Sequence, residues 1–67
     1  MKVNLSKIKG LMAEHGDTQL KLAEKLGISE VTLRNYLKQE TEMRVSTVGH
    51  IAKIYGVKPA ELLIPED

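Results

Sequence analysis

The apolar residues of this chain recur every three or four positions, which is the spacing of helices that bury one face. The first apolar stripe begins at Leu5, and a later one ends at Tyr55. The pattern predicts helices over residues 5–15, 19–26, 30–38 and 47–55, and a short fifth helix over residues 58–63. Pro59 favours the fifth helix because proline suits a first turn. No stretch shows the alternation and turn residues of a β-hairpin, so we expect an all-α fold.

Polar residues and glycines mark the ends of these helices. Residues suited to N-caps precede them: Asn4 or Ser6, Thr18, Ser29 and Ser46. Glycines that suit helix stops follow three of them: Gly16, Gly27 and Gly56. Gly10 lies inside the first helix, where it costs stability relative to alanine, and we interpret it as a mark of close packing.

The second and third predicted helices are separated by only three residues, Gly27-Ile28-Ser29. Gly27 suits a left-handed stop because it has no Cβ to clash, and Ile28 can fill the corner. Ala23 is small at a place where a bulky side chain would hold the two helices apart. Two short helices joined by a three-residue turn that contains glycine make a helix-turn-helix.

This stretch resembles the helix-turn-helix of the phage repressor and Cro family, the lambda-repressor-like DNA-binding domains. The residues that carry the resemblance are Gln19, Leu22, Ala23, Leu26, Gly27-Ile28-Ser29, Leu33 and Tyr36. The similarity continues from Val45 to Leu63, so it covers nearly the whole chain. It implies one domain over residues 1–67, with five short helices and the helix-turn-helix over residues 18–38. It also implies binding of double-stranded DNA, with the third helix in the major groove.

Four residues of the third helix are candidates for contacts with bases: Glu30, Val31, Arg34 and Asn35. They remain after Leu33, Tyr36 and Leu37 are assigned to the core, and the resemblance points to the first, second and fourth of them. Glu30 suits cytosine N4, Val31 a thymine methyl, Asn35 adenine N6 and N7, and Arg34 guanine or a phosphate. Two simpler interpretations stay open: Glu30 complements the helix dipole, and Val31 is an ordinary exposed apolar residue.

Four further residues are candidates for contacts with phosphates: Thr18, Gln19, Lys38 and Arg44. The start of the second helix offers free N–H groups to an anion, and in the family a glutamine at the place of Gln19 also braces a side chain of the third helix. Glu30 is the side chain we expect it to brace. Lys7 and Lys9 are better interpreted as solvated charges.

The chain departs from the family pattern after the third helix. Leu37-Lys38-Gln39 stands where a glutamate, one residue and a glycine are common, so we expect a different exit or a longer helix. The following loop contains Glu40 and Glu42, and two acidic groups would repel a phosphate backbone. The first helix also lacks the arginine that is frequent in the family.

Composition narrows the classes of function. The 67 residues have no cysteine, two widely separated histidines, two aromatic residues and a net charge of +1. We therefore expect no metal site, no cofactor and no small-molecule substrate, and no catalytic constellation that would make the chain an enzyme. No apolar run is long enough to span a membrane and no signal peptide is recognisable, so we expect a cytoplasmic protein. At this length we expect no separate sensor domain.

These observations predict a sequence-specific regulator of transcription that acts on operator DNA. The alternative is a protein-binding module with the same fold, such as an antitoxin or an antirepressor, which the near-neutral charge and the acidic loop favour. One recognition helix covers few base pairs, so a weak homodimer is expected on DNA. Its interface is predicted at Leu62, Ile64 and Tyr55, although the same run, Leu63 above all, could instead close the core.

Overall fold

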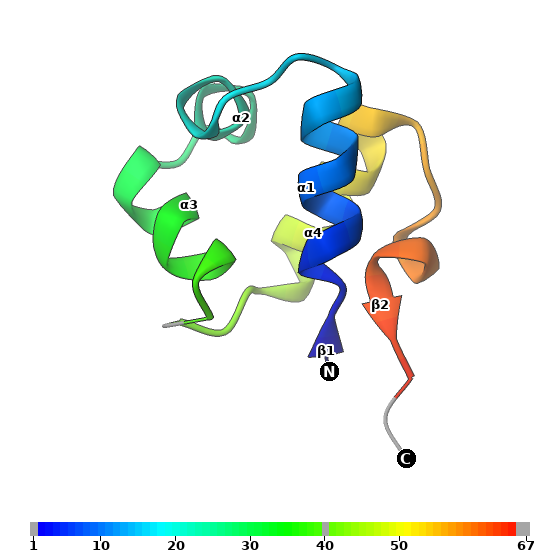
Figure 1. Cartoon of the computed structure of the whole chain (residues 1–67). Coiled ribbons are helices and arrows are strands. Elements are labelled where there is room, and N and C mark those ends of the chain that lie inside the picture. The colour runs from blue at the N-terminus through cyan, green and yellow to red at the C-terminus, as the bar shows by residue number, and fades with distance from the viewer. Residues whose placement is uncertain (1, 40, 66–67) are drawn as a thin grey trace.

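Four α-helices account for most of the part of the chain that the computed structural model describes, residues 2–39 and 41–65 (Figure 1). They are α1 (Leu5–Glu14), α2 (Gln19–Leu26), α3 (Glu30–Leu37) and α4 (Val45–Tyr55). A 3-10 helix, η1 (Pro59–Leu62), and two strands, β1 (Lys2–Val3) and β2 (Leu63–Ile64), complete these elements. In Figure 1, α2 and α3 lie on one side of the molecule, and the two strands lie side by side at its lower edge.

The first three helices begin at the predicted caps. The side-chain oxygens of Asn4, Thr18 and Ser29 each accept a hydrogen bond from the backbone N–H three residues later, at 3.1, 3.1 and 3.0 Å. The predicted cap at Ser46 is wrong, because α4 begins at Val45 and Arg44 is its N-cap. The Arg44 backbone is extended and its carbonyl accepts from Thr47 and Val48, so Ser46 already lies in the first turn.

The five-helix prediction is also wrong at the C-terminal end of the chain. Residues 59–62 form one 3-10 turn, and the residues after it are extended. Both flanks precede a proline: Lys58 comes before Pro59 and Ile64 before Pro65, and a residue before proline is pushed out of the α region. The few residues between the two prolines therefore form only one helical turn.

The extended residues pair with the start of the chain, which the hydrophobic pattern did not predict. β1 and β2 are antiparallel, with Lys2 opposite Ile64 and Val3 opposite Leu63. The backbone N–H of Asn4 continues the pairing with a 2.8 Å hydrogen bond to the Leu62 carbonyl. Asn4 thus caps α1 and ties the two ends of the chain together.

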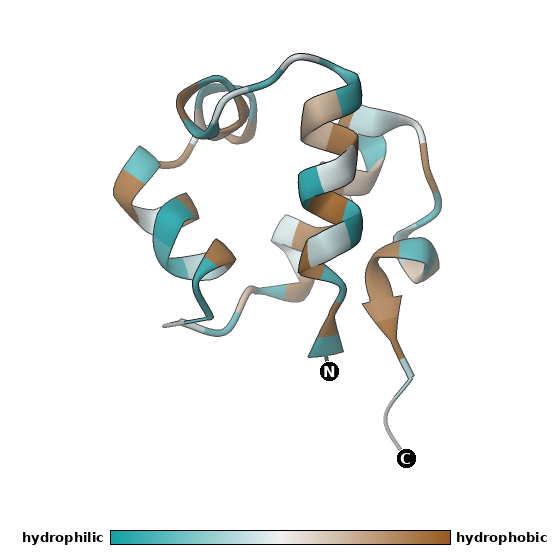
Figure 2. Ribbon diagram, viewed as in Figure 1, coloured by the Kyte–Doolittle hydropathy of each residue, from teal (hydrophilic) through white to brown (hydrophobic). Residues whose placement is uncertain are grey.

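The core is built from one face of each helix, as the spacing predicted. In Figure 2 hydrophobic residues alternate with hydrophilic ones along the helices, whereas β2 is hydrophobic throughout. The buried residues are Ile8, Leu11, Met12, Leu22, Ala23, Leu26, Leu33, Tyr36, Leu37, Met43, Val48, Ile51, Ala52, Tyr55 and Leu62. Met43 lies in the loop after α3, and its buried side chain fastens that loop to the core. Gly10 does not mark close packing, because a Cβ built there would meet no atom within 4 Å.

A polar cluster joins three separate elements at the edge of this core. The Asp17 carboxylate, in the connector between α1 and α2, accepts hydrogen bonds from Lys25 at 2.8 and 2.9 Å and from the Tyr55 hydroxyl at 2.9 Å. The Asp17 side chain is only 4% exposed. Donation by Lys25, and then by Tyr55, lowers the pKa of Asp17, while burial and the bond to Asp17 raise the pKa of Tyr55. The ring of His15 packs on that of Tyr55 with centroids 4.7 Å apart.

The chain leaves α3 through a left-handed residue that is not glycine. Lys38 is the right-handed C-cap, and Gln39 follows with φ 63°. The exit therefore has the geometry that a glycine would favour, although we expected a different one. A side chain in this conformation costs about 1–2 kcal/mol, because its Cβ crowds the following carbonyl.

We predict that Gln39→Gly stabilises the protein. Relief of the left-handed strain outweighs the entropy that glycine adds to the unfolded chain, and the net gain is about 0.5–1 kcal/mol. For a domain of this size, that gain corresponds to a rise of roughly 2–8 °C in melting temperature. The matched control is Lys38→Gly, which places glycine at a right-handed residue and should lower the melting temperature. Equal shifts in both variants would contradict this account of the exit.

We also predict that Asp17 makes stability depend on acid pH. Because its folded pKa lies below the ordinary value of 3.8, its contribution is complete above that value and is lost as pH falls through the folded pKa. Asp17→Asn should be less stable than the parent at pH 7, and the difference should shrink below about pH 4. Denaturant unfolding of both proteins from pH 2 to pH 7 measures this. Parallel stability profiles across that range would rule out the coupling.

Candidate nucleic-acid interface

The orientation of α3 is set by its short corner with α2. Gly27 has φ 71°, and the backbone N–H of Ile28 closes the end of α2 with a 3.1 Å bond to the Ala23 carbonyl. Ser29 then caps α3 directly, so the chain changes direction within three residues. Ala23 of α2 is buried in the core, where we expect it to face α3. Its single methyl group allows α3 to pack closely on α2.

This packing leaves one side of α3 facing away from the core. Leu33, Tyr36 and Leu37 are buried, as the sequence predicted. The four residues predicted to contact bases remain at least partly exposed: Glu30, Val31, Arg34 and Asn35. Val31 is 56% exposed, and among the large apolar side chains of the described residues only Val45, at 72%, is more exposed. The structure therefore brings all four candidates onto one accessible helix.

Glu30 pairs with a residue of its own helix. Its Oε1 lies 3.7 Å from Nη2 of Arg34, one turn further along α3. Among the hydrogen bonds of the described residues, none joins Glu30 to Gln19, which we had expected to brace it. The spacing of four residues between opposite charges on one helix is a signal in the sequence that could have identified this pair.

The four predicted phosphate-contacting residues lie at the ends of helices. Thr18 and Gln19 stand at the start of α2, where the Thr18 hydroxyl already accepts a hydrogen bond from Lys21. Lys38 is the exposed C-cap of α3, and Arg44 is the exposed N-cap of α4. All four therefore flank α2 and α3 or the loop that follows them.

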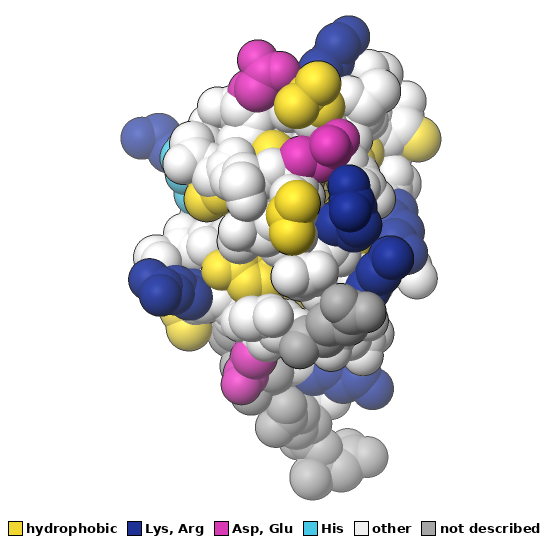
Figure 3. Space-filling view, turned by 90° about the vertical axis from the view of Figure 1, so that its left-hand side faces the viewer, with side chains coloured by type: hydrophobic (Ala, Val, Ile, Leu, Met, Phe, Trp, Pro, Cys, Tyr) yellow, Lys and Arg dark blue, Asp and Glu magenta, His cyan; other side chains and the backbone are white. Residues whose placement is uncertain are grey.

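The surface over α2 and α3 has mixed charge. Figure 3 shows this face with most Lys and Arg side chains around its margins, hydrophobic side chains nearer its centre, and acidic side chains at the top, near the centre and toward the bottom. This distribution suits a surface whose edges meet phosphates and whose centre meets bases, because phosphates flank the groove on both sides. It does not form a continuous basic patch.

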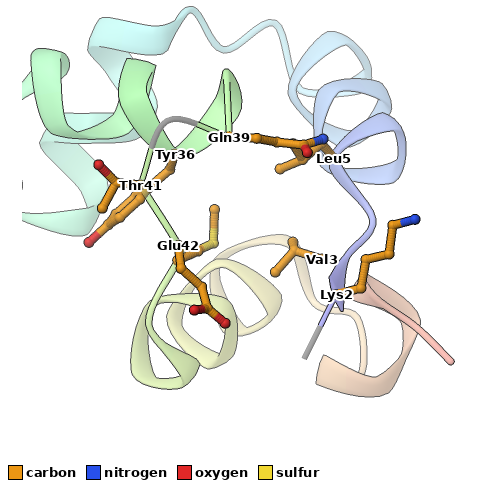
Figure 4. Close-up of a pocket in the computed structure, with 8 residues that line it drawn as sticks. Lys2, Val3, Leu5, Tyr36, Gln39, Thr41 and Glu42 are labelled. Carbon is orange, nitrogen blue, oxygen red and sulfur yellow. The ribbon is translucent and has the colours of Figure 1, made fainter. Parts of the chain in front are cut away.

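A hollow of about 220 Å³ lies between the exit of α3 and the N-terminal strand (Figure 4). Its lining comes from β1, the start of α1, the end of α3 and the following loop: Lys2, Val3, Leu5, Tyr36, Gln39, Thr41, Glu42 and Met43. Glu42 is exposed at its rim, whereas Glu40, the other predicted acidic residue of this loop, lies outside the described residues. The hollow lies where the chain leaves α3 at the left-handed residue Gln39.

Two of the three residues predicted to form a dimer interface are used by the core instead. Leu62 is 0% exposed and Tyr55 is 7% exposed, and the Tyr55 hydroxyl is bonded to Asp17. The 3-10 turn points Leu62 inward, where it packs with the helices. Ile64, in β2, keeps 37% of its surface. Of these three residues, only Ile64 leaves its apolar side chain exposed to solvent.

The chain is similar to known DNA-binding proteins over almost its full length. Residues 7–67 match the family described as the Cro/C1-type HTH DNA-binding domain. The chain is 37% identical over 62 residues to an uncharacterized HTH-type transcriptional regulator of Methanocaldococcus jannaschii, and the match covers 92% of this chain and 94% of that protein. No solved structure matches the chain. No helix in the described ranges is long and apolar enough to cross a membrane. The corner of α2 and α3 and the exposed side of α3 agree with the family match, and the chain belongs to the Cro/C1-type helix-turn-helix DNA-binding domain family.

Proposed function

We propose that this protein regulates transcription by binding a specific sequence in double-stranded DNA. The observation that carries the proposal is the division of α3 into a buried side and an accessible side with varied chemistry. Val31, Arg34 and Asn35 offer an apolar contact, a guanidinium fork and an amide, which are the groups that distinguish base pairs in the major groove. The relative in Methanocaldococcus jannaschii, named as a transcriptional regulator, supports the same role.

The phosphate contacts in this proposal come from both sides of α3. The N-terminus of α2 has backbone N–H groups at Gln19 and Leu20 that donate to no acceptor among the described residues, and such groups favour an anion. Lys38 and Arg44 add exposed positive charges after the C-terminal end of α3. Because the net charge is only +1, few counterions are released and the affinity for random DNA is modest.

The species that acts on DNA is, in this proposal, a homodimer with two α3 helices about 34–36 Å apart on one face of the duplex. Ile64 supports it as an exposed apolar residue at the sheet that joins the two ends of the chain. The area around one such residue is small, so the free protein is largely monomeric and pairs on DNA.

Two variants distinguish contacts with bases from contacts with phosphates. Asn35→Ala should weaken binding to the preferred site by about 1–3 kcal/mol and relax the preference at one base pair. Lys38→Ala should weaken binding to all sequences alike and reduce the salt slope by about 1. Selection from a random duplex pool, followed by titrations at several salt concentrations, measures both effects. If the parent binds no duplex even at low salt, the protein acts instead as a protein-binding module.

The dimer is tested by placing a charge on its proposed surface. Ile64→Asp should abolish cooperative binding to a palindromic site, because the carboxylate would be desolvated against the second chain. Ala13→Asp is the control, since Ala13 is an exposed apolar residue of α1 to which the proposal assigns no contact. Ultracentrifugation with and without DNA gives the stoichiometry. A parent that saturates one half-site at full affinity, with one chain per duplex, would refute the dimer.

A further inference from the structure

Glu30 and Arg34 form an ion pair in a place where stability gives little reason for one. Their side chains are 41% and 43% exposed, and the charged atoms are 3.7 Å apart. Exposed pairs at this spacing contribute at most about 1 kcal/mol to folding. The helix dipole already favours a carboxylate at the first position of α3. We therefore relate the pair to the contacts that α3 makes with DNA.

An acidic side chain on this surface opposes DNA binding unless its charge is balanced. The phosphates on both sides of the groove repel a carboxylate, and the repulsion is strongest when it stands alone. With Arg34 beside it, the two side chains together are nearly neutral. Glu30 can then remain at the interface without excluding the duplex.

The pair also biases Arg34, because the Glu30 carboxylate attracts the guanidinium across 3.7 Å, a distance longer than a hydrogen bond. A guanidinium carries five N–H donors in a rigid plane, and a carboxylate that faces one edge leaves the other donors directed outward. Two of these donors match O6 and N7 of guanine. A long side chain that is held before binding loses less rotamer freedom when the contact forms.

We infer that Glu30 is a positioning residue that acts through Arg34, and that the pair specifies one guanine in the DNA site. The inference rests on the proposed function and gives it a chemical detail. Arg34 contacts the base, whereas Glu30 orients the guanidinium and makes no base contact of its own. This assignment replaces the direct contact between Glu30 and cytosine that the sequence suggested.

The test compares preferences at single base pairs for the parent, Glu30→Ala, Arg34→Ala and the double variant. A site is selected from random duplexes with the parent, and affinities are then measured for all single-base changes of that site. Glu30→Ala and Arg34→Ala should reduce the preference for guanine at the same base pair, by about tenfold. The double variant should lose no more than Arg34→Ala does, because the two residues act as one unit.

Glu30→Ala should also bind random duplex DNA more tightly than the parent, since it removes a negative charge. Glu14→Ala is the matched control, because Glu14 is an exposed acid at the end of α1. It should not alter the base preference. Glu30→Gln keeps an acceptor without the charge and should retain part of the preference for guanine. A thermal melt of each variant confirms that the fold is intact.

Three results would overturn the inference. They are loss of preference at two different base pairs in the two single variants, an unchanged preference in Glu30→Ala, and a uniform loss of affinity across all sequences in Arg34→Ala. A parent that binds duplex DNA without any sequence preference, or does not bind it, would refute the proposed function itself and the inference with it. The parent titration therefore separates the two kinds of failure.

Discussion

The corner between α2 and α3 is the constraint on which the rest of this structure depends. Two eight-residue helices are too short to be stable alone, so each must bury its apolar side against the other elements at once. Ala23 makes a close crossing possible because it adds only a methyl group at the contact. Gly27 allows the chain to change direction between α2 and α3, because its left-handed conformation costs little without a Cβ. With both in place, Leu33 faces inward and the opposite side of α3 faces outward.

The remaining elements hold this corner in a fixed relation to the ends of the chain. Asp17 connects the start of the helix-turn-helix to α4 through Tyr55, and also binds Lys25 of α2. Met43 fastens the loop after α3 to the core, and the pairing of β1 with β2 closes the far side. A small domain buries little apolar surface. These polar and backbone hydrogen bonds therefore add to the packing that holds the fold together.

The exposed side of α3 combines modest charge with varied chemistry, and this combination favours specificity over general affinity. A strongly basic surface would bind any duplex, because counterion release does not depend on sequence. Here acidic Glu30 stands next to Arg34, and apolar Val31 lies beside them. Such a surface gains most from a sequence whose base edges match it, and gains little from phosphates alone.

The sequence by itself determined the helices and the corner. The buried residues of α1 to α4 follow the helical period, and the caps at Thr18, Ser29 and Gly27 follow from side-chain hydroxyls and a missing Cβ, which are local properties. The accessible residues of α3 were predictable for the same reason, since they are those the core leaves over. The ion pair of Glu30 with Arg34 was also visible as a spacing of four.

Only the tertiary structure decided the features that depend on distant partners. The pairing of β1 with β2 joins residues from the two ends of the chain, and strands of two residues carry no periodic signal. Tyr55 and Leu62 were expected at a dimer surface. Tyr55 is instead buried and bonded to Asp17, 38 positions earlier in the chain, and the inward 3-10 turn buries Leu62. Gln39 adopts the conformation that glycine prefers at the point where the chain leaves α3 and leads to the buried Met43. Each of these outcomes depends on which surfaces meet after the helices pack, which local preference does not specify.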